Sequence, residues 1–195
     1  MRKENTSLDI VHAAKSVFAR FGFKKTSMDM IARSIGKGKS SIYYYFKSKE
    51  DIFQAVVEQE AIELKNEIYH AVNSVELPRQ KLKTYILTRL KTLEKMDNLS
   101  NALRGDYLSN LHFINQVKAR YRAEEMEMVS EILLYGQQRG KFEFENVREV
   151  AKPIVLAISG LEMEYFINPM KEDMNEMERN LDLLLDVFFK GLSKS

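Results

Sequence analysis

The stretch that decides the fold reads "TSMDMIARSIGKGKSSIYYYFKSKEDIF", Thr26 to Phe53. One capping-box pattern begins at Thr26 and another at Ser48, and each pattern marks the start of a helix. Gly36 lies between two short apolar-periodic segments and predicts a tight turn. We therefore expect a helix-turn-helix over residues 27–46.

An aromatic run of three tyrosines and a phenylalanine lies in this stretch, with lysines and serines on both sides. A helix distributes such a run over different faces, because residues four apart share a face. Ile42 and Phe46 are therefore expected to face inward, while Tyr43 and Tyr44 face outward. An outward tyrosine can offer its hydroxyl to a phosphate oxygen with little side-chain entropy to lose.

In a helix-turn-helix, the second helix enters the major groove of DNA and the first helix braces it. Residues at the start of the second helix read base edges, and Lys37 or Lys39 could donate hydrogen bonds to guanine. Tyrosine, lysine and helix-start residues are expected to hold phosphates. The full set of expected DNA contacts is Thr26, Ser27, Lys37, Gly38, Lys39, Ser40, Ser41, Tyr43, Tyr44 and Lys49.

The charge distribution points the same way. Residues 1–51 carry eleven Lys and Arg against five acids, whereas the remaining 144 residues carry 19 basic and 23 acidic side chains. A basic head on an acidic body indicates a polyanionic partner for the head. Double-stranded DNA is the favoured partner. An interaction module whose head binds RNA or an acidic protein, without DNA sequence specificity, stays open as the alternative.

The rest of the chain is predicted to be helical, because Gly and Pro are few and no hairpin signal separates alternating runs. The pattern predicts an all-α fold of about nine helices. Residues 1–50 form the DNA-binding domain and residues 51–195 a larger helical domain. The first helix is expected from about Leu8 to Phe21, with a cap at Thr6 and a stop at Gly22. Another helix should start at Pro78, and a break is expected around Asn115. Near the C-terminus we expect a helix capped at Asn146 and kinked at Pro153, and then a last helix over 174–192.

Several other classes of protein are disfavoured. The chain has no cysteine, and its longest apolar stretch, Ile154 to Leu161, is far shorter than a membrane helix requires. The N-terminus does not resemble a signal peptide, so we expect a cytoplasmic protein without membrane contact. Its three histidines are isolated, and no phosphate-binding or nucleophile motif occurs. We therefore expect no enzymatic activity, no cofactor and no metal.

The segment from Thr26 to Phe53 resembles the tetracycline-repressor (TetR) family of transcriptional regulators. The residues that fit the family pattern are Ile31, Ala32, Gly36, Ser41, Ile42, Tyr43, Tyr45, Phe46, Lys49 and Glu50. The upstream "FARFGFKKTSM" is also similar to the family's first helix and its following glycine and threonine. The resemblance implies that Tyr43 and Lys49 hold DNA phosphates and that Lys39 faces the groove. Lys37 departs from the pattern, which usually has a small apolar residue there.

The resemblance further implies a bacterial, nucleoid-associated homodimer that binds a palindromic operator and is released by a small apolar or amphipathic effector. Apolar stripes on the last two long helices support a dimer, since a two-fold reader must span half-sites about 34 Å apart. The expected interface residues are Ile154, Ile158, Leu161, Tyr165, Leu181, Leu184, Leu185 and Phe188. The expected pocket residues, which could equally be plain core, are Tyr107, Phe113, Met126, Tyr135, Met163 and Phe166.

Overall fold

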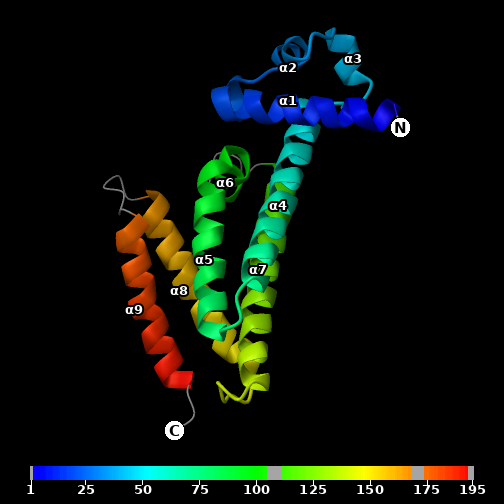
Figure 1. The fold of residues 1–195 in the computed structure, drawn as a ribbon. Coiled ribbons are helices and arrows are strands. Elements are labelled where there is room, and N and C mark those ends of the chain that lie inside the picture. The colour runs from blue at the N-terminus through cyan, green and yellow to red at the C-terminus, as the bar shows by residue number, and fades with distance from the viewer. Residues whose placement is uncertain (1, 105–110, 168–173, 193–195) are drawn as a thin grey trace. The chain divides into compact units, whose positions relative to one another are not determined.

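The computed structural model describes residues 2–104, 111–167 and 174–192, and within these residues it contains helices and no strand (Figure 1). The all-α prediction is confirmed. The helices are α1 Arg2–Lys25, α2 Met28–Ser34, α3 Lys39–Tyr43, α4 Lys49–Asn73, α5 Pro78–Lys95, α6 Asp97–Arg104, α7 His112–Gln138, α8 Val147–Ile167 and α9 Met174–Leu192.

The helices group into two compact units. The first comprises residues 1–65 and 93–118, and the second comprises residues 66–92 and 119–195. The first unit therefore includes more of the chain than the predicted DNA-binding domain. The expected functional boundary after residue 50 stays a prediction.

Helix α1 forms the base of the head in the first unit. Its apolar stripe, with Ile10 and Phe18, is buried. Gly22 interrupts the helix with a φ of 73°, a conformation that costs glycine little. This confirms the predicted stop at Gly22, although the chain resumes helical structure up to Lys25. The cap predicted at Thr6 is wrong, because α1 already begins at Arg2.

The starts of α2 and α4 differ in how well the sequence predicts them. The capping box at α4 is confirmed: the Ser48 amide donates to Asp51 Oδ2, and the Asp51 amide donates to Ser48 Oγ, both at 3.1 Å. At α2 the cap is Ser27 rather than Thr26, since Ser27 Oγ accepts from the Met30 amide at 3.3 Å. The two adjacent hydroxyl residues made the sequence pattern ambiguous by one position.

A buried carboxylate joins three helices of the first unit. Glu60 on α4 is 1% exposed, and its Oε2 accepts from the backbone amide of Leu99 at 2.7 Å. Its Oε1 accepts from Asn98 Nδ2 at 3.0 Å, and the same Asn98 nitrogen donates to the carbonyl of Lys15 on α1 at 3.1 Å. Burial raises the pKa of Glu60 above its ordinary value, although the bonds from Asn98 and Leu99 oppose this shift.

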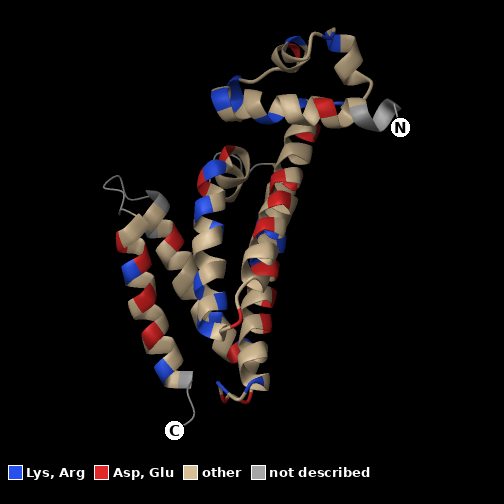
Figure 2. Cartoon of the chain, viewed as in Figure 1, with Lys and Arg blue, Asp and Glu red and all other residues tan. Residues whose placement is uncertain are grey.

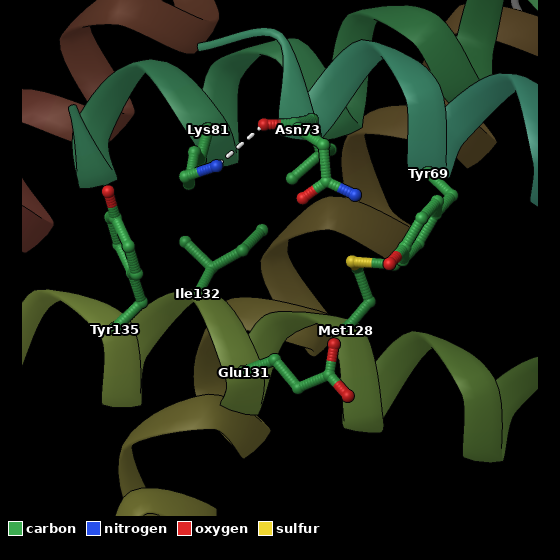
Figure 3. A pocket seen from close by; sticks show the side chains of 8 residues that line it. Tyr69, Asn73, Lys81, Met128, Glu131, Ile132 and Tyr135 are labelled. Carbon is green, nitrogen blue, oxygen red and sulfur yellow. Dashed lines mark hydrogen bonds between the residues drawn. The ribbon is translucent and has the colours of Figure 1, made fainter. Parts of the chain in front are cut away.

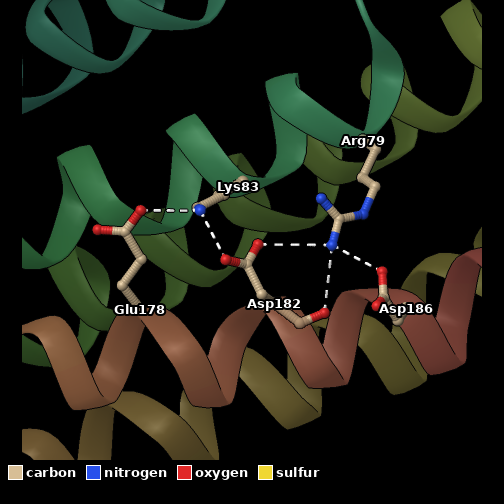
Figure 4. Close-up of polar contacts among 5 residues, drawn as sticks. All are labelled: Arg79, Lys83, Glu178, Asp182 and Asp186. Atoms are coloured by element: carbon tan, nitrogen blue, oxygen red, sulfur yellow. Dashed lines mark hydrogen bonds and ion pairs between the residues drawn. The ribbon is translucent and has the colours of Figure 1, made fainter.

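An ion-pair ladder fastens α9 to α5 in the second unit (Figure 4). Lys83 Nζ lies 2.8 Å from both Glu178 and Asp182, and Arg79 lies 2.7 Å from Asp186. Hydrogen bonds to Asp182 and then to Glu178 raise the pKa of Lys83. The ladder fixes which face of α9 is turned towards α5.

The remaining landmarks of the second unit are largely as expected. Pro78 begins α5, and α9 spans the predicted residues. Asn146 caps α8, because its Oδ1 accepts from the Arg148 amide at 3.0 Å, and Pro153 lies inside that helix. The break predicted around Asn115 is misplaced: α6 ends at Arg104 and α7 begins at His112, so Asn115 already lies within α7.

Candidate functional site

The helix-turn-helix is present in the head as predicted. A turn at Gly36, with a φ of 64°, separates α2 from α3. The Lys37 amide donates to the Ala32 carbonyl at 3.0 Å and closes this turn. Ile31 and Ile42 are fully buried, so each helix contributes an apolar anchor to the core of the head.

Helix α3 and the turn before it present cations, hydroxyls and aromatic rings to the surface. Lys37, Gly38, Lys39 and Ser40 are exposed. Tyr43 and Tyr44 are 47% and 63% exposed, whereas the neighbouring Ser41 is half-buried. Lys39 Nζ lies 5.8 Å from the centroid of the Tyr43 ring, a cation–π arrangement that leaves the ammonium in solvent.

The charge of this surface is one-sided. The sequence contains no acidic residue from Met30 to Lys49. Figure 2 shows Lys and Arg at the turn between α2 and α3, within this stretch, and also at the C-terminal end of α1, before it. Arg33 is the one cation of this stretch with an acidic partner in the described residues, Asp29 at 2.8 Å. Such a surface matches the phosphate backbone of a nucleic acid.

Two predicted contacts have roles inside the head. The side chain of Thr26 is 2% exposed, and its hydroxyl donates to the Gly22 carbonyl at 2.8 Å. This burial argues against the predicted contact of Thr26 with DNA. Ser27 is exposed, but its hydroxyl already accepts from the Met30 amide as the cap of α2.

The described residues of the predicted ligand pocket belong to both units, and their role in binding a ligand stays a prediction. Phe113 is buried in the first unit, where its ring lies 6.2 Å from that of Phe53. Met126 is half-buried on α7, and Met163 on α8 is 64% exposed. Tyr107 and the side chain of Phe166 lie outside the described residues. Tyr135 lines a cavity of about 150 Å³ in the second unit.

A cluster of buried polar side chains lies between α5, α7 and α8 in the second unit. The guanidinium of Arg89 is buried and donates to Tyr121 at 2.7 Å, to Tyr85 at 2.9 Å and to Glu162 at 2.8 Å. It also pairs with the buried carboxylate of Glu125. Burial raises the pKa of both tyrosines, so their hydroxyls stay protonated. Two carboxylates thus share one cation.

The residues predicted for the dimer interface divide into two groups. Leu161, Leu184 and Phe188 are half-buried and remain available to a partner. The other five are buried within the protomer, and a side chain without exposed surface adds little area to an interface; their place in an interface stays a prediction. These buried residues are Ile154, Ile158, Tyr165, Leu181 and Leu185.

A different face of α8 and α9 is apolar and exposed. Leu156 and Met163 on α8 are each 64% exposed, and Leu183 and Val187 on α9 are 67% and 71% exposed. Leu156 and Met163 are seven residues apart, and Leu183 and Val187 are four apart, so each pair lies on one side of its helix. Each helix therefore exposes an apolar pair on one of its sides.

Two further searches of the structure concern membranes and metals. None of the helices in the described ranges combines the length and apolarity that crossing a membrane requires. The described side chains also form no cluster of three or more His, Asp or Glu suited to a metal ion.

Comparison with known proteins identifies the class. Residues 10–56 match the family described as bacterial regulatory proteins, tetR family, and residues 73–194 match that described as QacR-like protein, C-terminal region. The chain is 24% identical over 188 residues to the HTH-type transcriptional regulator QacR of Staphylococcus aureus, covering 95% of this chain and 97% of that protein. It is 25% identical over 190 residues to the fatty acid metabolism regulator protein of Bacillus subtilis, covering 94% and 96%.

A solved structure agrees with these relatives. The crystal structure of a transcriptional regulator from Cytophaga hutchinsonii has a TM-score of 0.78 to this chain, with 30% identity over 95% of this chain and 97% of that one. Fold, basic head and relatives together define a DNA-binding regulator of transcription, and the prediction that the chain is not an enzyme is confirmed. The chain belongs to the TetR family of bacterial transcriptional regulators.

Proposed function

We propose that the chain works as a homodimer that represses transcription by occupying a palindromic operator. The observation that carries the proposal is the surface of α3 and its preceding turn, where exposed lysines, a serine and two tyrosines lie together without an acidic side chain. The start of α3 would read bases, and the lysines and tyrosines around it would hold phosphates. As a DNA-binding regulator, the protein would act in the bacterial cytoplasm, at the nucleoid.

The dimer would form through the exposed apolar face of α8 and α9. A second copy of the chain is the expected occupant, because two heads are needed to contact half-sites about one helical turn apart. Leu156, Met163, Leu183 and Val187 would meet their counterparts across a two-fold axis. The half-buried Leu184 and Phe188 would form the edge of this contact.

A small-molecule effector would release the operator by a shift between conformers. A ligand changes such an equilibrium only by its difference in affinity for the two states. An effector would therefore bind preferentially to a dimer whose heads are wrongly spaced for the operator. Binding of operator and effector would then be reciprocally antagonistic.

The test is a salt-titrated binding assay on DNA from upstream of the protein's own gene, with random duplex as competitor. Wild type is compared with Lys39→Ala and with Lys95→Ala, which removes the same charge from an exposed position on α5. The proposal predicts a palindromic footprint, and a salt slope that Lys39→Ala lowers by about one unit and Lys95→Ala leaves unchanged. Equal binding to every duplex would refute operator recognition and favour the RNA or acidic-protein alternative.

A further inference from the structure

Lys81, in the first turn of α5, places its ammonium group inside the second unit (Figure 3). The residue is only 8% exposed. Its Nζ donates to the carbonyl oxygen of Val72, in the last turn of α4, at 2.8 Å. The same nitrogen lies 5.0 Å from the centroid of the Tyr135 ring. A carbonyl and an aromatic face thus surround the charge.

This buried charge has no counter-ion in the described part of the chain, because no carboxylate there lies within 4.0 Å of Lys81 Nζ. Lys83, two residues along the same helix, has two such partners although it is more exposed. Burial of an ammonium is costly unless an opposite charge or several hydrogen bonds compensate it. An ammonium has three donors, and the carbonyl of Val72 takes one of them.

A cavity of about 150 Å³ opens beside this ammonium. Polar groups at the cavity are the amide of Asn73 and the hydroxyl of Tyr69, and its apolar wall is formed by Ile132 and Met128 (Figure 3). Engineered apolar cavities of about this volume hold benzene, a molecule of about six heavy atoms. The full lining consists of Tyr69, Val72, Asn73, Lys81, Met128, Glu131, Ile132 and Tyr135.

The surrounding charges favour an anion over a cation. The first turn of α5 carries no acidic side chain, and the positive end of its helix dipole adds to the charge of Lys81. Glu131 is the one acidic residue in the lining. Its side chain is exposed and extends away from Lys81 along the rim (Figure 3). An anion placed at Lys81 would therefore lie nearer to the ammonium of Lys81 and the amide of Asn73 than to the carboxylate of Glu131.

We propose that this cavity binds a small organic carboxylate. Its anionic group would accept hydrogen bonds from Lys81 Nζ and Asn73 Nδ2, and its short apolar tail would pack against Ile132 and Met128. The size of the cavity limits the ligand, or the part of it that is enclosed, to about six heavy atoms. Carboxylate binding itself does not depend on the proposed function. Only the further step, in which the bound carboxylate would release the operator, rests on it.

A purely structural role for Lys81 makes a different prediction. If its ammonium serves only to cap the C-terminal end of α4, its removal would destabilise the protein equally with and without a carboxylate. Anion binding instead makes the stabilisation depend on the ligand and on its charge.

The experiment uses butanoate, which has six heavy atoms, and butanamide, a neutral molecule of almost the same shape. Thermal unfolding and calorimetric titration are recorded on the full chain at constant ionic strength. Wild type should gain thermal stability with butanoate and not with butanamide. Lys81→Met should weaken butanoate binding at least about tenfold, the factor that a loss of about 1.4 kcal/mol produces.

Two variants keep the test decisive if Lys81→Met folds poorly. Asn73→Leu removes the exposed amide at the cavity and should weaken butanoate binding while the protein stays folded. Lys91→Met removes a charge from an exposed position on the same helix and should bind butanoate like wild type. Equal stabilisation by butanamide, or unchanged butanoate binding in both Asn73→Leu and a folded Lys81→Met, would overturn the proposal.

The two proposals fail in distinguishable ways. Butanoate binding is measured without DNA, so a failure to find an operator leaves the cavity assignment intact. If butanoate binds at Lys81 and the operator affinity does not change, the carboxylate site stands and the ligand-release mechanism is wrong for this ligand.

Discussion

The Nζ of Lys49 donates a hydrogen bond to the carbonyl oxygen of Phe23 at 3.0 Å and lies 4.4 Å from the centroid of the Phe23 ring. One lysine thus ties the start of α4 to the end of α1. Because an ammonium has three donors, the same group can still hold a DNA phosphate.

We expect Lys49→Ala to affect both stability and DNA binding. Loss of the hydrogen bond and of the cation–π contact should lower the free energy of unfolding by about 1 kcal/mol. The salt slope of operator binding should fall by about one unit. Urea unfolding and salt titration measure the two effects, with Lys47→Ala, an exposed neighbour, as the stability control. A stability loss with an unchanged slope would make Lys49 an anchor of the head and not a DNA contact.

If the dimer forms through the exposed apolar side chains of α8 and α9, changing them should abolish the dimer and leave the protomer folded. The double change Leu183→Ser and Val187→Ser should halve the mass measured by sedimentation while the helical circular dichroism is retained, because both side chains are exposed in the protomer. Leu185→Ala is the matched control on the same helix. Its side chain is buried, so this change should cost about 2–5 kcal/mol of stability. A double variant that remains dimeric would place the interface elsewhere.

Arg89 should be the most sensitive polar residue of the second unit. Arg89→Met leaves the carboxylates of Glu125 and Glu162 without their shared cation, and breaking a buried pair in this way costs about 3–5 kcal/mol. Urea unfolding measures this loss, and Arg120→Met, at an exposed position of α7, serves as the control. Adding Glu125→Gln should recover part of the loss, since it removes one uncompensated charge. Equal effects of Arg89→Met and Arg120→Met would contradict the cluster's role.

Glu60 predicts a pH dependence with a definite sign. In the folded state the pKa of Glu60 is raised above its ordinary value of 4.5. At a pH between the ordinary pKa and the folded-state pKa, Glu60 therefore binds more protons in the folded protein than in the unfolded chain. The contribution of Glu60 to the free energy of unfolding therefore falls as the pH rises through this window. Urea unfolding of wild type and Glu60→Gln over a pH series isolates this contribution, with Glu127→Gln as an exposed control. A wild-type advantage that grew with pH would contradict the prediction.

Local signals in the sequence predicted much of the fold. The turn at Gly36, the Ser48–Asp51 capping box and the Asn146 cap each depend on neighbouring residues, and all three are confirmed. The cap predicted at Thr6 is wrong. A capping pattern shows where a helix can start, but it does not prevent an earlier start, as at Arg2.

The sites in the larger domain were harder to predict, because periodicity identifies an apolar stripe without identifying what covers it. Ile154 and Leu185 belong to such stripes and are buried within the protomer, whereas Leu183 and Val187 lie exposed beside them. Buried polar residues give a weak signal of another kind. Glu60 and Arg89 each stand among apolar neighbours, in "VVEQEAI" and "YILTRLK", but in a single sequence such charges look like the solvated side of a helix.

The bonds around Glu60 also bear on how freely heads can be exchanged between regulators. A chimera joined after residue 50 would keep Lys15 from one parent and take Glu60 and Asn98 from the other, although all three meet in one network. In this protein the portable module is therefore not a continuous piece of sequence. A graft that keeps the native junction must carry α6 along with the head and residues 49–65 of α4.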